Sequence, residues 1–138
     1  MLQIPIVVVD DTKSDRYIVR RRLAKHADFT DIIEFATGYE FLDGFFVPPV
    51  ADQVNDRKAV ILMDINMPRL NGFETIEALQ ERLSVEDRPN RIVVMMFTSS
   101  DNPADRQRVA AYGIVKGYIV KPLDEAGVAE ILRLYAAI

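Results

Sequence analysis

Polar residues able to do chemistry follow directly after four apolar stretches of this sequence. The apolar stretches run over Ile4 to Val9, Ala59 to Met63, Ile92 to Phe97 and Gly117 to Val120. The polar residues that come next are Asp10-Asp11, Asp64, Thr98-Ser99-Ser100 and Lys121. In an open sheet of parallel strands, ligands bind beyond the carboxyl ends of the strands. We therefore expect these side chains to meet at one rim of a sheet.

The types of these residues indicate a site for a metal ion and an anion. Three carboxylates at one rim, from Asp10, Asp11 and Asp64, would repel one another unless a cation neutralised them. Mg²⁺, a hard ion that prefers oxygen ligands, is the simplest choice. Lys121 adds an ammonium group and Thr98 a hydroxyl, and both suit a phosphoryl group. A carboxylate can accept such a group as a nucleophile and form an acyl phosphate.

The pattern of the chain predicts the elements that would position this rim. The four apolar stretches are unbroken, which is typical of parallel strands covered on both faces, and Ile32 to Phe35 is a weaker fifth candidate. Between the strands, apolar residues recur with helical spacing, most clearly at Phe73, Ile76, Leu79 and Leu83 and at Val128, Ile131, Leu132 and Tyr135. Alternating strands and helices predict an α/β fold, a doubly wound five-stranded parallel sheet with helices on both faces.

The helix boundaries are indicated by residues with capping chemistry. The expected helix starts lie at Asn71, at Asp101 or Asn102 before Pro103, and at Asp124. Gly113 is expected to close the helix that begins near Pro103. The stretch from Phe45 to Arg57 has no helical period and contains Pro48-Pro49, so it predicts a surface loop with at most a helical extension at its start.

The bulk properties of the chain exclude several functions. With 138 residues, we expect one domain over residues 1–138. The absence of cysteine excludes disulfides, thiolate metal sites and thiol nucleophiles. A net charge of -4 argues against a nucleic-acid partner. No apolar stretch is long enough to span a membrane and no leader pattern is present, so we expect a cytoplasmic protein without a membrane partner.

Segments around the polar residues resemble the signature blocks of response regulator receiver domains, of the CheY-like, stand-alone type. In the family's order, the matching segments are Val7-Val8-Val9-Asp10-Asp11, Ile61-Leu62-Met63-Asp64-Ile65-Asn66-Met67-Pro68 with Gly72, Phe97-Thr98-Ser99, and Tyr118-Ile119-Val120-Lys121-Pro122. The resemblance covers essentially the whole chain. It implies the flavodoxin-like strand order 2-1-3-4-5 and a cis bond between Lys121 and Pro122.

The resemblance also implies a role for each residue of the site. Asp64 would be the phosphoacceptor, and the donor would be a sensor histidine kinase or a histidine phosphotransfer protein. The implied Mg²⁺ ligands are Asp10, Asp11, Asp64 and the backbone carbonyl of Asn66. The implied phosphoryl-binding and switch residues are Thr98, Ser99, Lys121 and Tyr118. The residues implied to tune dephosphorylation are Asn66 and Ser100.

The implied function is a two-component or phosphorelay switch rather than an enzyme. Its output would be a changed surface for an unidentified protein target, with a homodimer as one form of that output. The stretches Phe45 to Arg57 and Ser84 to Asn90 are longer than usual in the family. In this they resemble stand-alone receivers that partner phytochrome-type kinases.

Two other functions stay open beside the switch. The chain could be a receiver-like interaction module that works without phosphorylation. Loss of the acceptor, of an acidic residue of the site or of the lysine would favour this alternative, but all of them are present. It could also be an aspartate-nucleophile phosphatase similar to haloacid dehalogenases. Those enzymes place a second aspartate two residues after the nucleophile, where this chain has Asn66. As an isolated pair, Asp10 and Asp11 would equally suit a helix cap.

Overall fold

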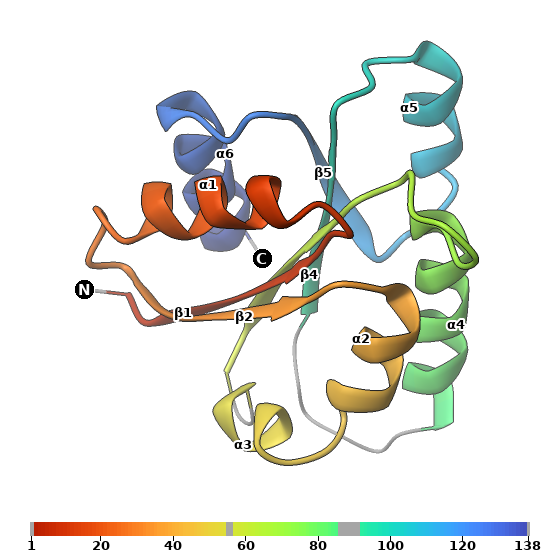
Figure 1. Cartoon of the computed structure of the whole chain (residues 1–138), viewed down its shortest axis with the longest axis horizontal. Helices are drawn as coiled ribbons and strands as arrows, with labels where there is room; N and C mark the ends of the chain where they lie inside the picture. Colours follow the sequence, from red (N-terminus) through yellow and green to blue (C-terminus); the bar gives the residue numbers. More distant parts are fainter. Residues whose placement is uncertain (1, 55–56, 86–91, 138) are drawn as a thin grey trace.

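Five parallel strands form one sheet at the centre of the molecule (Figure 1). This computed structural model describes residues 2–54, 57–85 and 92–137. The strands are β1 (Ile4–Val9), β2 (Phe29–Phe35), β3 (Ala59–Met63), β4 (Ile92–Thr98) and β5 (Val115–Val120). Their order is β2-β1-β3-β4-β5, and each neighbouring pair is parallel. The predicted doubly wound sheet and its strand order are therefore confirmed.

Helices cover both faces of the sheet (Figure 1). One face carries α1 (Lys13–Leu23) and α6 (Glu125–Ala136). The other face carries α2 (Gly38–Gly44), α3 (Val50–Val54), α4 (Gly72–Val85) and α5 (Pro103–Val109). No helix in the described part of the chain is long and apolar enough to cross a membrane.

The three central strands explain why the apolar runs in the sequence are unbroken. Side chains alternate between the two faces of a strand, and here both faces are covered by helices. In β1, for example, Val7 and Val9 pack toward α2 and α4, whereas Ile6 and Val8 pack toward α1 and α6. All four side chains are fully buried. The two cores fix the strands, and with them the rim at their carboxyl ends.

The helix starts follow the predicted capping residues. Asn71 Oδ1 accepts the backbone N–H of Glu74, and the Glu74 carboxylate accepts the N–H of Asn71, which is a reciprocal capping box. Asn102 rather than Asp101 caps α5, with Pro103 as the first helical residue. Asp124 caps α6 by accepting the N–H of Gly127 at 2.8 Å.

Gly113 does not close α5, contrary to the prediction. The helix ends at Val109, and Ala110 is its cap residue with right-handed backbone angles. Short turns continue the chain, in which Ala111 and Tyr112 donate to the carbonyls of Arg108 and Val109. Because these turns satisfy the last carbonyls, the helix end needs no glycine in a left-handed conformation.

The prediction of a surface loop from Phe45 to Arg57 is also wrong. This stretch contains α3. Its apolar residues Phe45, Phe46, Val50 and Val54 are buried in the core on the face of the sheet that carries α2 and α4. Pro48 and Pro49 separate α2 from α3 and hide the helical period in the sequence. Of the other lengthened stretch, Ser84 and Val85 end α4, and residues 86–91 lie outside the described part of the chain.

Candidate metal and anion site

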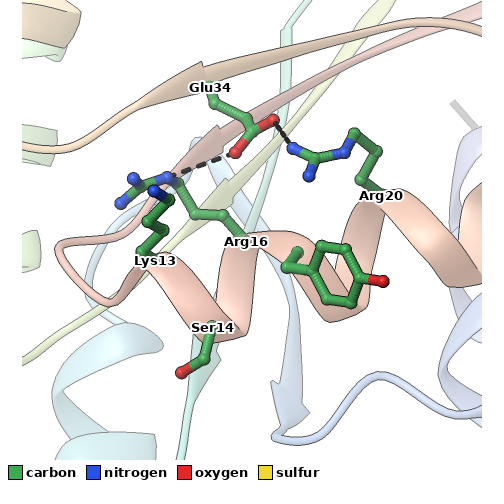
Figure 2. Close-up of a pocket in the computed structure, with 6 residues that line it drawn as sticks. Lys13, Ser14, Arg16, Arg20 and Glu34 are labelled. Carbon is green, nitrogen blue, oxygen red and sulfur yellow. Dashed lines mark hydrogen bonds and ion pairs between the residues drawn. The ribbon is translucent and has the colours of Figure 1, made fainter.

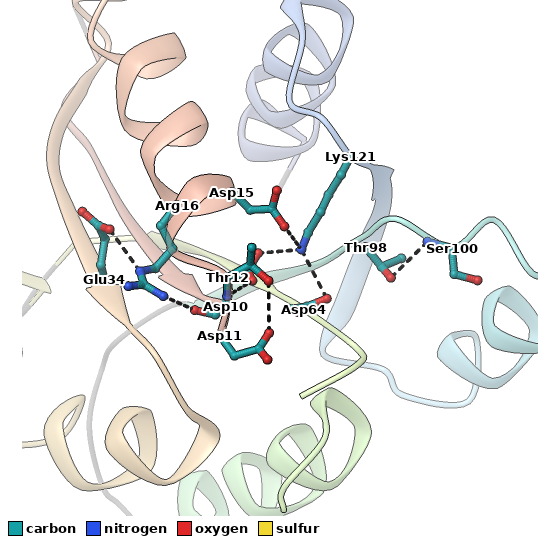
Figure 3. Close-up of polar contacts among 10 residues, drawn as sticks. All are labelled: Asp10, Asp11, Thr12, Asp15, Arg16, Glu34, Asp64, Thr98, Ser100 and Lys121. Carbon is teal, nitrogen blue, oxygen red and sulfur yellow. Dashed lines mark hydrogen bonds and ion pairs between the residues drawn. The ribbon is translucent and has the colours of Figure 1, made fainter. Parts of the chain in front are cut away.

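The polar residues that follow the strands do meet at one rim (Figure 3). The backbone N–H of Asp64 donates to the carbonyl of Val9 at 2.9 Å, which ties the end of β3 to the end of β1. The N–H of Lys121 likewise donates to the Thr98 carbonyl at 2.8 Å and ties β5 to β4. The sheet register itself therefore brings residues from four distant segments together.

Asp10, Asp11 and Asp64 form a cluster of three carboxylates. Each offers one oxygen, and these oxygens lie within 4.8 Å of one another. Asp10 and Asp64 are buried, whereas Asp11 is exposed. Hard cations such as Mg²⁺ take several oxygen ligands and usually keep water ligands as well. The donor atoms and the open side at Asp11 fit such an ion, because two ligands are fixed and solvent can reach the third.

Asp10 is held in place by several partners. Its Oδ1 accepts the N–H of Thr12 at 2.9 Å, and its Oδ2 lies 2.7 Å from Lys121 Nζ. The Arg16 guanidinium donates to its backbone carbonyl at 2.6 Å. The cap residue of α1 is Thr12, and no side chain in the described part of the molecule caps this helix end, so the alternative that Asp10 is a helix cap is wrong. The Oδ2 atom of Asp10 belongs to the charged cluster.

Lys121 Nζ lies among three carboxylates. It is 2.7 Å from Asp10 Oδ2, 2.9 Å from Asp15 Oδ2 and 3.5 Å from Asp64 Oδ1. Burial alone would lower the pKa of Lys121, but the hydrogen bonds with Asp10 and Asp15 outweigh it and hold the pKa above its usual value. The ammonium is therefore a fixed positive charge at the rim.

The Asp64 carboxylate is unusually costly to ionise. Burial is the largest cause, the negative charge of Asp10 adds to it, and Lys121 only partly offsets both, so that the pKa of Asp64 rises to about 7. A perturbed carboxyl group in a charged cluster is typical of functional sites. A divalent cation between the carboxylates would remove this cost, since opposite charge favours the ionised form.

Gly72 shapes the turn beyond Asp64. A Cβ at this position would lie 2.2 Å from the carbonyl oxygen of Asp64 and 2.9 Å from the Cα of Ile65. The N–H of Gly72 donates to the Ile65 carbonyl at 2.8 Å. Only glycine permits this close approach of α4 to the strand end that carries Asp64.

Thr98 and Tyr118 lie on the other side of the rim. Thr98 is fully buried, and its Oγ1 accepts the N–H of Ser100 at 3.3 Å. The hydroxyl of Tyr118 donates to the Ser100 carbonyl at 2.7 Å, and the Arg106 guanidinium lies 4.3 Å from the centre of its ring. Tyr118 is half-buried and packs against the core on one face of the sheet, and Ser100 and Arg106 contact it as well.

The remaining predicted site residues lie within two positions of Asp64 and Thr98 in the sequence. Ser99 is exposed beside Thr98, and Asn66 is exposed two residues after Asp64. The bond between Lys121 and Pro122 is cis, as the resemblance implied. The ligand role of the Asn66 carbonyl and the tuning roles of Asn66 and Ser100 stay predictions.

Sequence reasoning missed two residues of the site, Asp15 and Arg16. Asp15 contacts Lys121, and Arg16 joins the Asp10 carbonyl to Glu34 on β2. Figure 2 shows that Arg16 and Arg20 both pair with Glu34. Their position four and five residues after Asp11, in the first turns of α1, is a signal that they lie near the rim, but it does not indicate which residues they contact.

The fold and the site define the receiver class of two-component signalling proteins, and comparison with known families agrees. The model of the family described as "Response regulator receiver domain" matches residues 6–133. The chain therefore belongs to the response regulator receiver domain family.

Individual relatives are similar over nearly the whole chain. Protein PilH of Pseudomonas aeruginosa is 30% identical over 120 residues, which cover 87% of each chain. The crystal structure of a response regulator receiver protein from Dyadobacter fermentans is 26% identical, with a TM-score of 0.75 over 96% of this chain and 98% of the other. The bacteriophytochrome response regulator AtBRR shares the fold, with 24% identity and a TM-score of 0.75 over 100% of this chain and 95% of that one.

Proposed function

We propose that Asp64 accepts a phosphoryl group from a phosphohistidine of a sensor histidine kinase or a histidine phosphotransfer protein. The observation that carries the proposal is the cluster at the rim: Asp64 lies within 4.8 Å of two further carboxylates and 3.5 Å from a buried ammonium. Two-component signalling through a receiver domain is what the family membership supports. The role of each residue is part of the proposal.

In this reaction an oxygen of the Asp64 carboxylate attacks the phosphorus of the donor. The new bond joins oxygen to phosphorus, the bond between phosphorus and the histidine nitrogen breaks, and its electron pair stays on the imidazole. Catalysis of such a transfer rests on positioning and charge neutralisation rather than on a strong base. The buried, fixed carboxylate of Asp64 provides the positioning.

Asp10, Asp11, Asp64 and the Asn66 carbonyl would hold Mg²⁺. When bound, the ion would neutralise the carboxylates and the phosphoryl oxygens. Because the pKa of Asp64 is about 7 without a cation, a nearby positive charge also keeps the nucleophile ionised at neutral pH. Lys121 would also contact the phosphoryl oxygens, since its ammonium is already 3.5 Å from Asp64.

The switch would run from Asp64 through Thr98 to Tyr118. In this structure the Thr98 hydroxyl accepts the backbone N–H of Ser100, so its own proton can be donated to a phosphoryl oxygen. Movement of Thr98 would disturb Ser100, whose carbonyl holds the Tyr118 hydroxyl. The ring would then turn inward and change the surface of α5, β5 and α6. An added phosphoryl charge that biases a two-state element is a general form of switching.

The test is intact-mass spectrometry after incubation with acetyl phosphate and Mg²⁺. We expect one labile phosphoryl adduct that requires Mg²⁺ and is absent from Asp64→Asn. The matched control is Asp52→Asn, which removes an exposed carboxylate from α3 and should still form the adduct. An adduct that persists in Asp64→Asn would contradict the assignment of the acceptor. No adduct with acetyl phosphate or with any phosphohistidine donor would favour the phosphorylation-independent interaction module.

A further inference from the structure

Asp15 contacts Lys121 but has no part in the proposed switch. It lies in the first turn of α1, and its Oδ2 is 2.9 Å from Lys121 Nζ (Figure 3). The distance from the same Nζ to Asp64 Oδ1 is 3.5 Å. In this structure the ammonium is thus closer to Asp15 than to the proposed phosphoacceptor, Asp64.

The environment of this ion pair distinguishes it from ordinary surface charge pairing. The Lys121 side chain is only 8% exposed, whereas Asp15 is 29% exposed and lies at the solvent side. An acidic residue in the first turn of a helix is favourable for the helix dipole alone. That general effect requires no contact with a buried lysine 106 residues away in the sequence. The contact therefore has to be explained by the site.

The ammonium of Lys121 has three N–H donors, and Asp10 and Asp15 take the two shortest contacts. A phosphoryl group on Asp64 would bring further negative charge and would need the same ammonium. Asp15 opposes that group in two ways, because it occupies a donor and because its own charge repels the anion. Asp15 is also the more exposed residue of its ion pair with Lys121. Its carboxylate can therefore turn away from the ammonium into solvent, so that its charge does not remain buried and unpaired.

We propose that Asp15 is a positioning residue that competes with the phosphoryl group for the Lys121 ammonium and so limits how fully and how long Asp64 stays phosphorylated. This inference rests on the proposed function of Asp64. It predicts that loss of the Asp15 charge shifts the protein toward the phosphorylated state.

The first experiment measures binding of beryllofluoride, a mimic of the phosphoryl group, by ¹⁹F NMR at saturating Mg²⁺. In Asp15→Asn the half-saturating concentration should fall by up to about fivefold, the range expected for a partly exposed ion pair. Asp52→Asn, an exposed carboxylate on α3, should leave it unchanged. If Asp15 served only the helix, its substitution would change the unfolding midpoint and not the binding of the anion.

A second measurement separates competition for Lys121 from a general charge effect. The ¹⁵Nζ signal of Lys121 can be assigned by its loss in Lys121→Gln. Without beryllofluoride, this signal should differ between the wild-type protein and Asp15→Asn, because one of its partners is missing. With saturating beryllofluoride the two signals should converge, since Asp15 no longer contacts the ammonium.

The outcomes are distinct. Unchanged or weaker beryllofluoride binding by Asp15→Asn would overturn the inference, and so would ¹⁵Nζ signals that stay equally far apart in the bound state. Neither result would affect the assignment of Asp64. A wild-type protein that binds no beryllofluoride at saturating Mg²⁺ would instead overturn the proposed function, and the inference with it.

Discussion

Replacing Asp64 by asparagine should stabilise the protein when no divalent cation is present. The Asp64 carboxylate is buried beside Asp10, and burial together with that charge raises its pKa from 3.8 to about 7. Lys121 only partly offsets this cost. Asparagine has nearly the same shape and carries no charge. The substitution therefore removes the free-energy cost of burying a negative charge at the site.

The pKa values determine the magnitude and the pH dependence of this effect. Between pH 4 and 7 the folded protein binds more protons at Asp64 than the unfolded chain does, so wild-type stability falls as the pH rises through that window. The rise in the pKa of Asp64 from 3.8 to about 7 corresponds to a loss of about 4 kcal/mol in the free energy of unfolding, at roughly 1.4 kcal/mol per pH unit. The gain from Asp64→Asn should thus be near zero at pH 4 and reach up to about 4 kcal/mol above pH 7.

Urea denaturation at pH 5 and pH 8, in the presence of a chelator, measures this gain. The Asp64→Asn protein should exceed the wild-type protein by far more at pH 8 than at pH 5. Asp52→Asn, which removes an exposed carboxylate, should change the free energy of unfolding by less than about 0.5 kcal/mol at either pH. Equal or lower stability of Asp64→Asn at pH 8 would refute the reasoning.

Three further predictions follow from single contacts. Gly72→Ala should destabilise the protein by about 2 kcal/mol or more in urea denaturation, because its Cβ would lie 2.2 Å from the Asp64 carbonyl oxygen; a cost below about 0.5 kcal/mol would contradict the close approach. Val54→Ala should cost about 1–2 kcal/mol in the same assay, since Val54 is buried, whereas a surface loop would tolerate the change. Asp11→Asn should raise the Mg²⁺ concentration needed for thermal stabilisation about tenfold, and an unchanged concentration would remove Asp11 from the ligand set.

The core of the site was predictable because it depends on topology alone. Parallel strands end at one rim, so an unbroken apolar run followed by Asp10, Asp64 or Lys121 is enough to place these residues together. The helix starts at Asn71 and Asp124 were predictable for a similar reason. A cap is a local interaction between a side chain and the next backbone N–H groups, and the sequence contains both partners.

The features that sequence reasoning missed depend on distant contacts. The helix α3 has five residues and follows two prolines, so only the burial of Val50 and Val54 against the rest of the core reveals it. Asp15 lies on a helix whose rotation about its axis the sequence does not determine. Its contact with Lys121 joins residues 106 positions apart. Periodicity and motifs contain no information about such a pair.

The site of phosphorylation can be read directly by trapping the acyl phosphate. Borohydride reduces an aspartyl phosphate to homoserine, and trypsin then releases the peptide Ala59 to Arg69, in which Asp64 is the only side-chain carboxylate. After incubation with acetyl phosphate and Mg²⁺, mass spectrometry of this peptide should show homoserine at position 64 and unmodified aspartate when Mg²⁺ is omitted. Homoserine at Asp10, Asp11 or another aspartate, with position 64 unchanged, would contradict the central claim.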